Sequence, residues 1–296
     1  MVARKQGQSG VDGGSSPRRG RSLTWVLVVV GIALLAVIVL AIQRRHAVTA
    51  TAATPPQPTT VPAAVMADFT RIPAATWQRA GTTNAAPPTF VGDSDRVDGK
   101  PVVLYIGAGY CPYCASARWS VIAALSRFGT FAGLTYSASS AEDVFPSTPT
   151  FSFHGSSYTS PYVEFQSVEL QGDVMLPNHQ YAPLEEPTPA QQAFLQKYDV
   201  APYVDPASAG GIPFILVGGR YMWSGSPFSP DVLAGQAQDR IAATLPAGSG
   251  AAARAILANA NELTATICAL DGNRPTEVCS DPVIQTAIKA LPSKAP

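Results

Sequence analysis

A CPYC motif at residues 111–114 stands at the end of an apolar run and at the start of a helix-like stretch. Within the apolar run 101–110, residues 102–106 predict a buried strand, and residues 115–128 predict a helix. Proline is favoured at the first position of a helix, so the motif makes Cys111 the N-cap and Cys114 the third helical residue. A dithiol is therefore expected where a strand ends and a helix begins.

This expected position of Cys111 favours thiol chemistry. At a helix N-terminus its sulfur faces unpaired backbone N–H groups and the positive end of the helix dipole, and both stabilise a thiolate. We expect Cys111 to have a lowered pKa and to act as the exposed nucleophile. Cys114 lies within one helical turn, so it is expected to attack the mixed disulfide on Cys111 and release the partner.

Two other uses of the motif are alternatives. Pairs of cysteines with this spacing form half of many zinc sites, but Cys268 and Cys279 are far downstream and no histidine stands near either pair. The motif is also compatible with a permanent structural disulfide. The sequence predicts thiol–disulfide chemistry without a metal ion or an organic cofactor.

An apolar segment near the N-terminus predicts membrane anchoring. Residues 24–42 contain no charged side chain and are long enough to cross a bilayer, so a transmembrane helix is expected over 23–43. Five basic residues precede the segment and two follow it closely, which predicts a cytoplasmic N-terminus and an extracytoplasmic C-terminal part. All four cysteines lie in that outer part, where disulfides persist. A signal peptide cleaved at 50–52 is the alternative.

Charge is distributed unevenly along the chain. Residues 1–46 carry seven basic residues and one acid, a net charge of +6, whereas residues 47–296 have a net charge of −6. The basic flank is interpreted as a topology signal that also attracts anionic lipid. The acidic outer part argues against nucleic acid as a partner.

The outer part shows the element order of a mixed α/β fold. A capping box opens a helix at Thr188, and Gly218-Gly219 suits the tight turn of a hairpin. The expected strands are 102–106, 134–137, 162–170, 213–217 and 220–223, and the other expected helices are 64–77, 229–245, 249–270 and one starting at 282.

Together, the CPYC motif and the later segment Gly211-Ile212-Pro213-Phe214 resemble the thioredoxin superfamily over roughly residues 101–245. The resemblance implies a cis-proline at Pro213 beside the dithiol, with Ile212 aligning an extended substrate by strand addition. A trans proline that starts a strand is the alternative. Tyr110 and Tyr113 flank the dithiol and either form an apolar rim for substrates or cover the helix end.

The resemblance extends to more particular relatives and has one departure. The motif itself is similar to that of glutaredoxins, while the anchor and the long segment before Pro213 resemble DsbA-type exported enzymes with a helical insert. The whole arrangement resembles the domain-of-unknown-function family 929. Thioredoxins carry a buried acid six residues before the first cysteine, where this chain has Tyr105, a poor base at neutral pH.

The resemblance gives an expected organisation and function. The expected segments are a disordered basic cytoplasmic tail (1–22), a transmembrane helix (23–43), an Ala/Thr/Pro linker (44–65), a thioredoxin-like domain with an insert (66–246) and a C-terminal helical extension (247–296). The expected function is a thiol–disulfide oxidoreductase, held in the cell membrane by a single span, that acts on the cysteines of exported proteins. A membrane quinone-linked or thiol redox partner would exchange electrons with it. The alternative is a non-catalytic thioredoxin-like module for binding, assembly or metal delivery in the cell envelope.

The late cysteines are expected to form a structural disulfide separate from the active site. A long helix is predicted to end near Cys268, and a loop leads to Cys279 before the last helix, so a bridge would fasten the two helices together. Neither cysteine has a proline at a helix start beside it. A second redox pair that passes electrons to Cys114 is the alternative.

Overall fold

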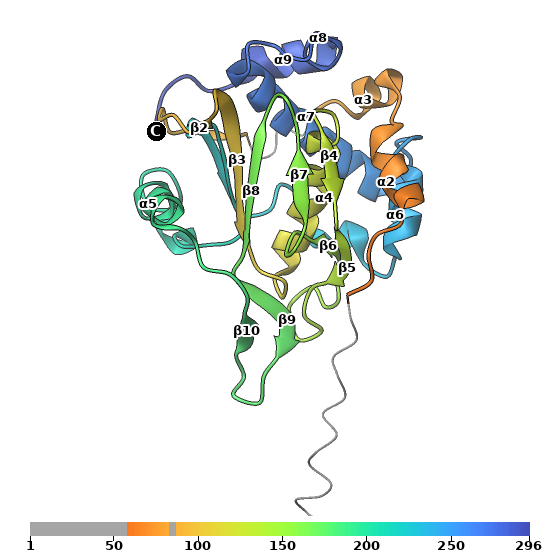
Figure 1. The fold of residues 1–296 in the computed structure, drawn as a ribbon, viewed down its shortest axis with the longest axis vertical. Coiled ribbons are helices and arrows are strands. Elements are labelled where there is room, and N and C mark those ends of the chain that lie inside the picture. The colour runs from red at the N-terminus through yellow and green to blue at the C-terminus, as the bar shows by residue number, and fades with distance from the viewer. Residues whose placement is uncertain (1–57, 83–86) are drawn as a thin grey trace, which may run out of the picture. The chain divides into compact units, whose positions relative to one another are not determined.

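The computed structural model describes residues 58–82 and 87–296, within one compact unit, Pro58–Pro296. Its largest sheet contains β1 (Thr89–Phe90), β2 (Arg96–Val97), β3 (Lys100–Gly107), β8 (Glu164–Glu169), β11 (Phe214–Val217) and β12 (Tyr221–Ser224). The order is β1-β12-β11-β3-β2, and β8 also pairs with β3. β8 runs parallel to β3, whereas β11 is antiparallel to both β3 and β12. Figure 1 shows this mixed α/β arrangement, which confirms the predicted class.

β3 is the central strand of the sheet because its side chains suit burial on both faces. Its segment Val102-Val103-Leu104-Tyr105-Ile106 is completely buried, as expected for an apolar, partly β-branched run flanked by two other strands. In the register, Ile106 lies opposite Phe214 of β11 and Val168 of β8. The end of β3 is thus held on both sides just before the dithiol.

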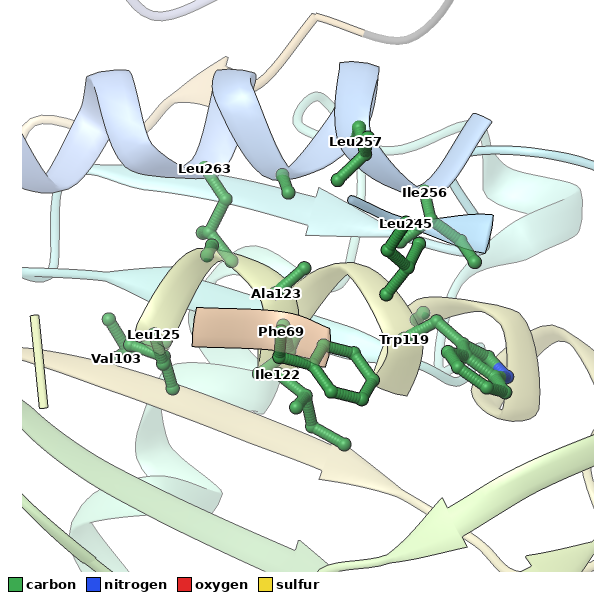
Figure 2. Close-up of a cluster of buried hydrophobic side chains, with 14 of the residues drawn as sticks. Phe69, Val103, Trp119, Ile122, Ala123, Leu125, Leu245, Ile256, Leu257 and Leu263 are labelled. Atoms are coloured by element: carbon green, nitrogen blue, oxygen red, sulfur yellow. The ribbon is translucent and has the colours of Figure 1, made fainter. Parts of the chain in front are cut away.

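Helices cover the sheet. They are α2 (Ala63–Thr70), α3 (Ala74–Ala80), α4 (Pro112–Leu125), α5 (Pro189–Tyr198), α6 (Gln238–Thr244), α7 (Gly250–Leu270), α8 (Thr276–Cys279) and α9 (Pro282–Ala290). α4 lies between β3 and α7, and every residue of α4 from Cys114 onward is buried. Figure 2 shows this core, with Leu263 of α7 on one side of Ala123 and Val103 of β3 on the other. Residues 247–296, expected as an extension, therefore supply one wall of the core.

Short strands fill the segment between α4 and β11. β4 (Thr130–Ala132) pairs with β7 (Ser157–Thr159), β5 (Thr135–Ala138) with β6 (Pro149–Ser152), and β9 (Gln171–Met175) with β10 (Tyr181–Pro183). Within residues 126–213, all of which are described, α5 is the only α-helix. The predicted helix of the insert is confirmed as α5, whereas the pairs β4–β7 and β9–β10 were not expected. Ser, Thr and aromatic residues in this segment favour such strands.

Local signals decide several boundaries. Thr188 forms the predicted capping box with Gln191, and Gly218 and Gly219 have φ of 57° and 67° in the predicted hairpin. The single helix expected over 229–245 is wrong. The chain instead forms a 3-10 turn (Pro230–Leu233) and then α6. Gly235, between them, has a φ of 70°, and a residue in this conformation interrupts a right-handed helix.

The expected membrane anchor lies outside the described residues. These exclude the tail at 1–22, the expected transmembrane helix at 23–43 and most of the linker, and none of the described helices is long and apolar enough to span a membrane. The folded unit begins before the expected boundary at residue 66. Val61 and Val65 are buried, and the Val61 amide donates a hydrogen bond to the Leu134 carbonyl oxygen at 2.9 Å.

Candidate active site

Cys111 lies between β3 and α4, as the sequence predicted. Its φ of −78° and ψ of 121° are those of an extended N-cap residue, and Pro112 takes the first helical position. The backbone N–H of Cys114 donates a hydrogen bond to Cys111 Sγ at 3.1 Å. The Cys111 sulfur thus replaces the side-chain oxygen that caps most helices, which is a favourable place for a thiolate.

The two thiols differ in exposure, although less than expected. Cys111 is 5% exposed and Cys114 is completely buried, in a cluster against Tyr110, Leu170 and Ile212. Cys111 is thus the more accessible sulfur, but the expectation of an exposed nucleophile is wrong. The segment after β8 and the loop before β11 both close over it.

The pKa values of the two thiols shift in opposite directions. A hydrogen bond from the Cys114 thiol lowers the pKa of Cys111, and the Cys114 amide and the charge of Arg118 lower it further against the opposing effect of burial. Burial, followed by the hydrogen bond to Cys111, raises the pKa of Cys114 well above its ordinary value. The reduced dithiol therefore carries its negative charge on Cys111, with the proton retained on Cys114.

The second sequence motif lies beside the dithiol. The Ile212–Pro213 peptide bond is cis, which confirms the expectation for Pro213. Cys111 Sγ lies 3.8 Å from the carbonyl oxygen of Ile212, within reach of a weak S–H hydrogen bond. β11 begins at Phe214, immediately after the cis bond. Residues 101 positions apart in the chain are thus in contact at one end of the sheet.

A groove opens next to Cys111. It encloses about 550 Å³ and is lined in part by Tyr113, Phe145, Ile212, Pro227 and Phe228, with serines and glycines completing it and no charged side chain in its lining. Tyr113 is 41% exposed and packs its ring edge-on against Phe145. The groove can therefore accept an uncharged, extended segment of polypeptide beside the dithiol.

Tyr110 faces a different neighbour. Its ring stacks on Tyr181 of β10 at 4.2 Å between centroids, and the adjacent Gly109 amide donates to the Gln171 carbonyl oxygen of β9 at 2.6 Å. The β9–β10 hairpin, which projects from the lower end of the sheet in Figure 1, is thus fastened to the loop before Cys111. This contact fits the reading of Tyr110 as a cover for the helix end better than the reading as a substrate rim.

A buried ion pair beneath the dithiol was missed from the sequence. Arg118, one turn beyond Cys114 in α4, donates from Nε and Nη2 to the Glu169 carboxylate at 2.8 and 2.6 Å. Both side chains are 1% exposed. The guanidinium carbon of Arg118 lies 5.7 Å from the centroid of the Tyr105 ring. The signal available in the sequence was one basic residue in an otherwise apolar and uncharged helix.

The late cysteines form the predicted disulfide. Cys268 in α7 and Cys279 at the end of α8 are bonded, with their Cα atoms 5.5 Å apart. Both sulfurs lie in the large core cluster, apart from the small cluster that contains Cys111 and Cys114. Across the described residues, no three His, Cys, Asp or Glu side chains are grouped as a metal site requires.

Comparison with known proteins gives one match. No curated protein and no solved structure matches the chain. The sequence model of a family described as Domain of unknown function (DUF929) matches residues 93–269, which is more than half of the chain. The matched region runs from just before β2 to the end of α7 and includes the CPYC motif and the cis-proline loop. The chain therefore belongs to the DUF929 family.

Proposed function

We propose that this protein is a thiol–disulfide oxidoreductase that acts through Cys111 and Cys114 on the cysteines of exported proteins. The observation that carries the proposal is the hydrogen bond from the Cys114 amide to Cys111 Sγ at the start of α4. A thiolate placed there is stabilised by the helix terminus, and a lowered thiol pKa is what distinguishes reactive cysteines from structural ones.

The fold we propose for it is thioredoxin-like. The spatial order β8-β3-β11-β12, with β8 parallel to β3 and the last two strands antiparallel, is the βαβ and ββα arrangement expected from the resemblance. The dithiol follows β3, and the cis-proline precedes β11. Both features thus meet at the same end of the sheet.

The proposed chemistry is a two-step exchange. The Cys111 thiolate attacks a substrate disulfide, a mixed disulfide forms, and one substrate sulfur leaves as a thiolate. Cys114 then gives its proton to a leaving sulfur or to solvent and attacks Cys111, which releases the second substrate thiolate and leaves the Cys111–Cys114 disulfide. Two electrons pass from the protein to the substrate, and the reverse sequence oxidises a substrate dithiol.

The substrate would lie along the groove beside Cys111. Ile212 lines this groove and offers backbone for an extended chain, buried Pro213 fixes that backbone by its cis bond, and Tyr113 offers apolar surface at the rim. An uncharged groove favours polypeptide segments that are unfolded or locally extended. We assign Tyr110 mainly to positioning the loop before Cys111.

We place this activity outside the cytoplasm, on a chain held in the cell membrane by residues 23–43. The charge asymmetry around the apolar segment supports this orientation. The Cys268–Cys279 disulfide is consistent with an oxidising compartment. A quinone-linked membrane protein or a second thiol protein would restore the redox state of the dithiol after each turnover.

A mixed-disulfide trap tests the proposal. Cys114→Ser removes the resolving thiol, so the full-length chain is expected to accumulate covalent adducts with exported cysteine-containing proteins, visible on non-reducing gels. Cys111→Ser with Cys114→Ser is the matched control and should form none. Adducts that persist in this control, or that form with Cys111→Ser alone in place of Cys114→Ser, would contradict the assignment of the nucleophile.

The low exposure of the dithiol favours one second candidate. Because Cys111 is only 5% exposed and Cys114 is completely buried, the pair also suits a non-catalytic module for binding or assembly. Equilibration with glutathione separates the two functions. Exchange within minutes supports the oxidoreductase, whereas a pair that stays in one redox state supports the module.

A further inference from the structure

A single cation is buried one helical turn below the dithiol. Arg118 follows Cys114 by four residues in α4, so both side chains lie on the same face of that helix. Its guanidinium has a pKa raised above the ordinary value by Glu169, despite the opposing effect of burial, and therefore stays charged. A permanent positive charge thus lies in a water-excluded region beside two titrating sulfurs.

Glu169 compensates this charge only in part on the side of the dithiol. The carboxylate occupies Nε and one edge of Nη2, while Nη2 also donates to the carbonyl oxygen of Ala108 at 2.8 Å. Nη1 has no hydrogen-bond partner among the described residues. Ala108 packs in the same small cluster as Cys111 and Cys114, so the Ala108 side of the guanidinium faces the sulfurs.

Tyr105 is the third polar side chain at this place, after Arg118 and Glu169. Its hydroxyl is completely buried, has no hydrogen-bond partner in the described structure, and has a pKa raised well above its ordinary value, mainly by burial. It is therefore neutral, and it stands where thioredoxins carry a buried acid. Position 105 of this chain thus carries a neutral phenol where thioredoxins carry an anion, and Glu169, the buried carboxylate of this site, is paired with Arg118.

We propose that Arg118 is a positioning residue that makes the Cys111–Cys114 couple oxidising, so that the protein donates its disulfide to exported polypeptides. This inference rests on the proposed function and adds the direction of the reaction. The reduced dithiol carries its negative charge on Cys111, while the disulfide carries none. A nearby cation therefore stabilises the reduced form, and stabilising the reduced form makes the disulfide a stronger oxidant.

The directions of the thiol pKa values agree with this role. The charge of Arg118 is among the causes that lower the pKa of both cysteines, and its effect reaches Cys111 as well as the nearer Cys114. An acid at position 105 would oppose the same charge on the sulfurs.

The proposed turnover oxidises a substrate dithiol to a disulfide and reduces the Cys111–Cys114 bond. A substrate thiolate attacks Cys111 Sγ and breaks the Cys111–Cys114 bond, and Cys114 leaves as a thiolate and takes up a proton. The second substrate thiolate attacks the substrate sulfur of the mixed disulfide, forming the substrate disulfide, and Cys111 leaves as a thiolate. Two electrons pass to the protein, and the substrate thiols release two protons, one of which Cys114 retains. A quinone-linked or disulfide-bearing oxidant reforms the Cys111–Cys114 bond.

Two charge variants with opposite expected signs test this inference. The equilibrium between the full-length chain and mixtures of reduced and oxidised glutathione is measured by trapping free thiols. E169Q keeps the cation and removes its counter-ion, so the disulfide should become more oxidising by about tenfold in the equilibrium constant. R118M combined with E169Q removes both charges and should make it less oxidising than the wild type by about tenfold, or about 30 mV for a two-electron couple.

Matched controls separate electrostatics from a loss of structure. R118K keeps the charge and should remain close to the wild-type equilibrium. K100M with E164Q removes the 3.2 Å ion pair between β3 and β8, far along the strand from the dithiol, and should leave the equilibrium unchanged. If R118M with E169Q does not fold, R118Q with E169Q replaces the ion pair with two amides. The disulfide of this variant should also be less oxidising than that of the wild type by about tenfold in the equilibrium constant.

The possible outcomes are distinct. The inference is supported if the glutathione equilibrium constant shifts in opposite directions for E169Q and for R118M with E169Q. It is overturned if neither variant shifts the constant, or if both shift it in the same direction in proportion to their loss of melting temperature. A wild-type chain that does not exchange with glutathione at all would instead overturn the proposed function.

Discussion

The backbone amide of Cys114 and the sulfur of Cys111 are joined by a hydrogen bond of 3.1 Å across the first turn of α4. The contact forms only if Cys111 is an N-cap and Cys114 is helical, so the folding of this turn itself activates the sulfur. Unfolding of the turn would return both thiols to their ordinary reactivity. Thiol reactivity is therefore a direct measurement of the local structure.

The first prediction concerns pH. Because the pKa of Cys111 is lowered and that of Cys114 is raised, alkylation of the reduced protein should modify Cys111 alone, with a midpoint below the ordinary value of 9.0. The lowered pKa of Cys111 contributes stability to the folded, reduced protein above the unfolded value of 9.0, and this contribution is lost as the pH falls through the folded pKa, whereas the raised pKa of Cys114 acts in the opposite sense above 9.0. Mass-spectrometric alkylation rates, and unfolding compared with Cys111→Ser, measure both effects. A midpoint at or above 9.0 would contradict the capping argument.

The second prediction concerns the late disulfide. Cys268→Ala with Cys279→Ala opens a bridge between residues 11 apart, which should cost roughly 2–3 kcal/mol in the chain-entropy account. The melting temperature should fall by about 5–10 °C for a unit of this size. Exchange at the CPYC dithiol should be unchanged. Lost turnover with unchanged stability would make this pair part of the electron path.

The third prediction concerns the core beneath the site. Trp119 is completely buried between Phe69 and Phe151, and its indole N–H donates to the Pro149 carbonyl oxygen at 2.9 Å. Trp119→Ala should destabilise the protein by about 3–5 kcal/mol, because it leaves a cavity and an unpaired carbonyl. Arg254→Ala, at an exposed position of α7, is the control and should change stability by less than about 0.5 kcal/mol. Denaturant unfolding of both variants provides the comparison.

The fourth prediction concerns the groove. Tyr113→Ala removes an apolar wall, so the KM for an unfolded dithiol peptide should rise several-fold while exchange with glutathione stays the same. Val144, 70% exposed beside Phe145 but outside the groove lining, is the matched control, and Val144→Ala should leave both measurements unchanged. Equal losses with peptide and glutathione would mean that Tyr113 supports the dithiol and does not contact substrate.

Local sequence signals predicted the part of the site that depends on neighbours in the chain. Pro112 after Cys111, the Thr188 capping box and the Gly218-Gly219 turn each act within a few residues, so they could be recognised without the fold. The cis bond before Pro213 followed from the resemblance.

Contacts between distant segments could not be predicted in this way. Arg118 meets Glu169 only because β8 pairs in parallel with β3, and the two residues are 51 positions apart. The hairpins between α4 and β8 have strands of three or four residues, too short for a clear alternating pattern. The same limit explains why most of these short strands were not predicted.

The packing of α7 against α4 has a consequence for how this chain can be divided. A fragment that ends at residue 246 would keep the CPYC motif and the whole sheet, yet it would expose to water the side of α4 that holds Ala123 and its neighbours. The helix that carries the reactive sulfur would then lose the wall that fixes its axis. A chimera that carries the redox centre would therefore have to include the carboxy-terminal helices as well. Chimeras joined at residue 246 should fail to fold.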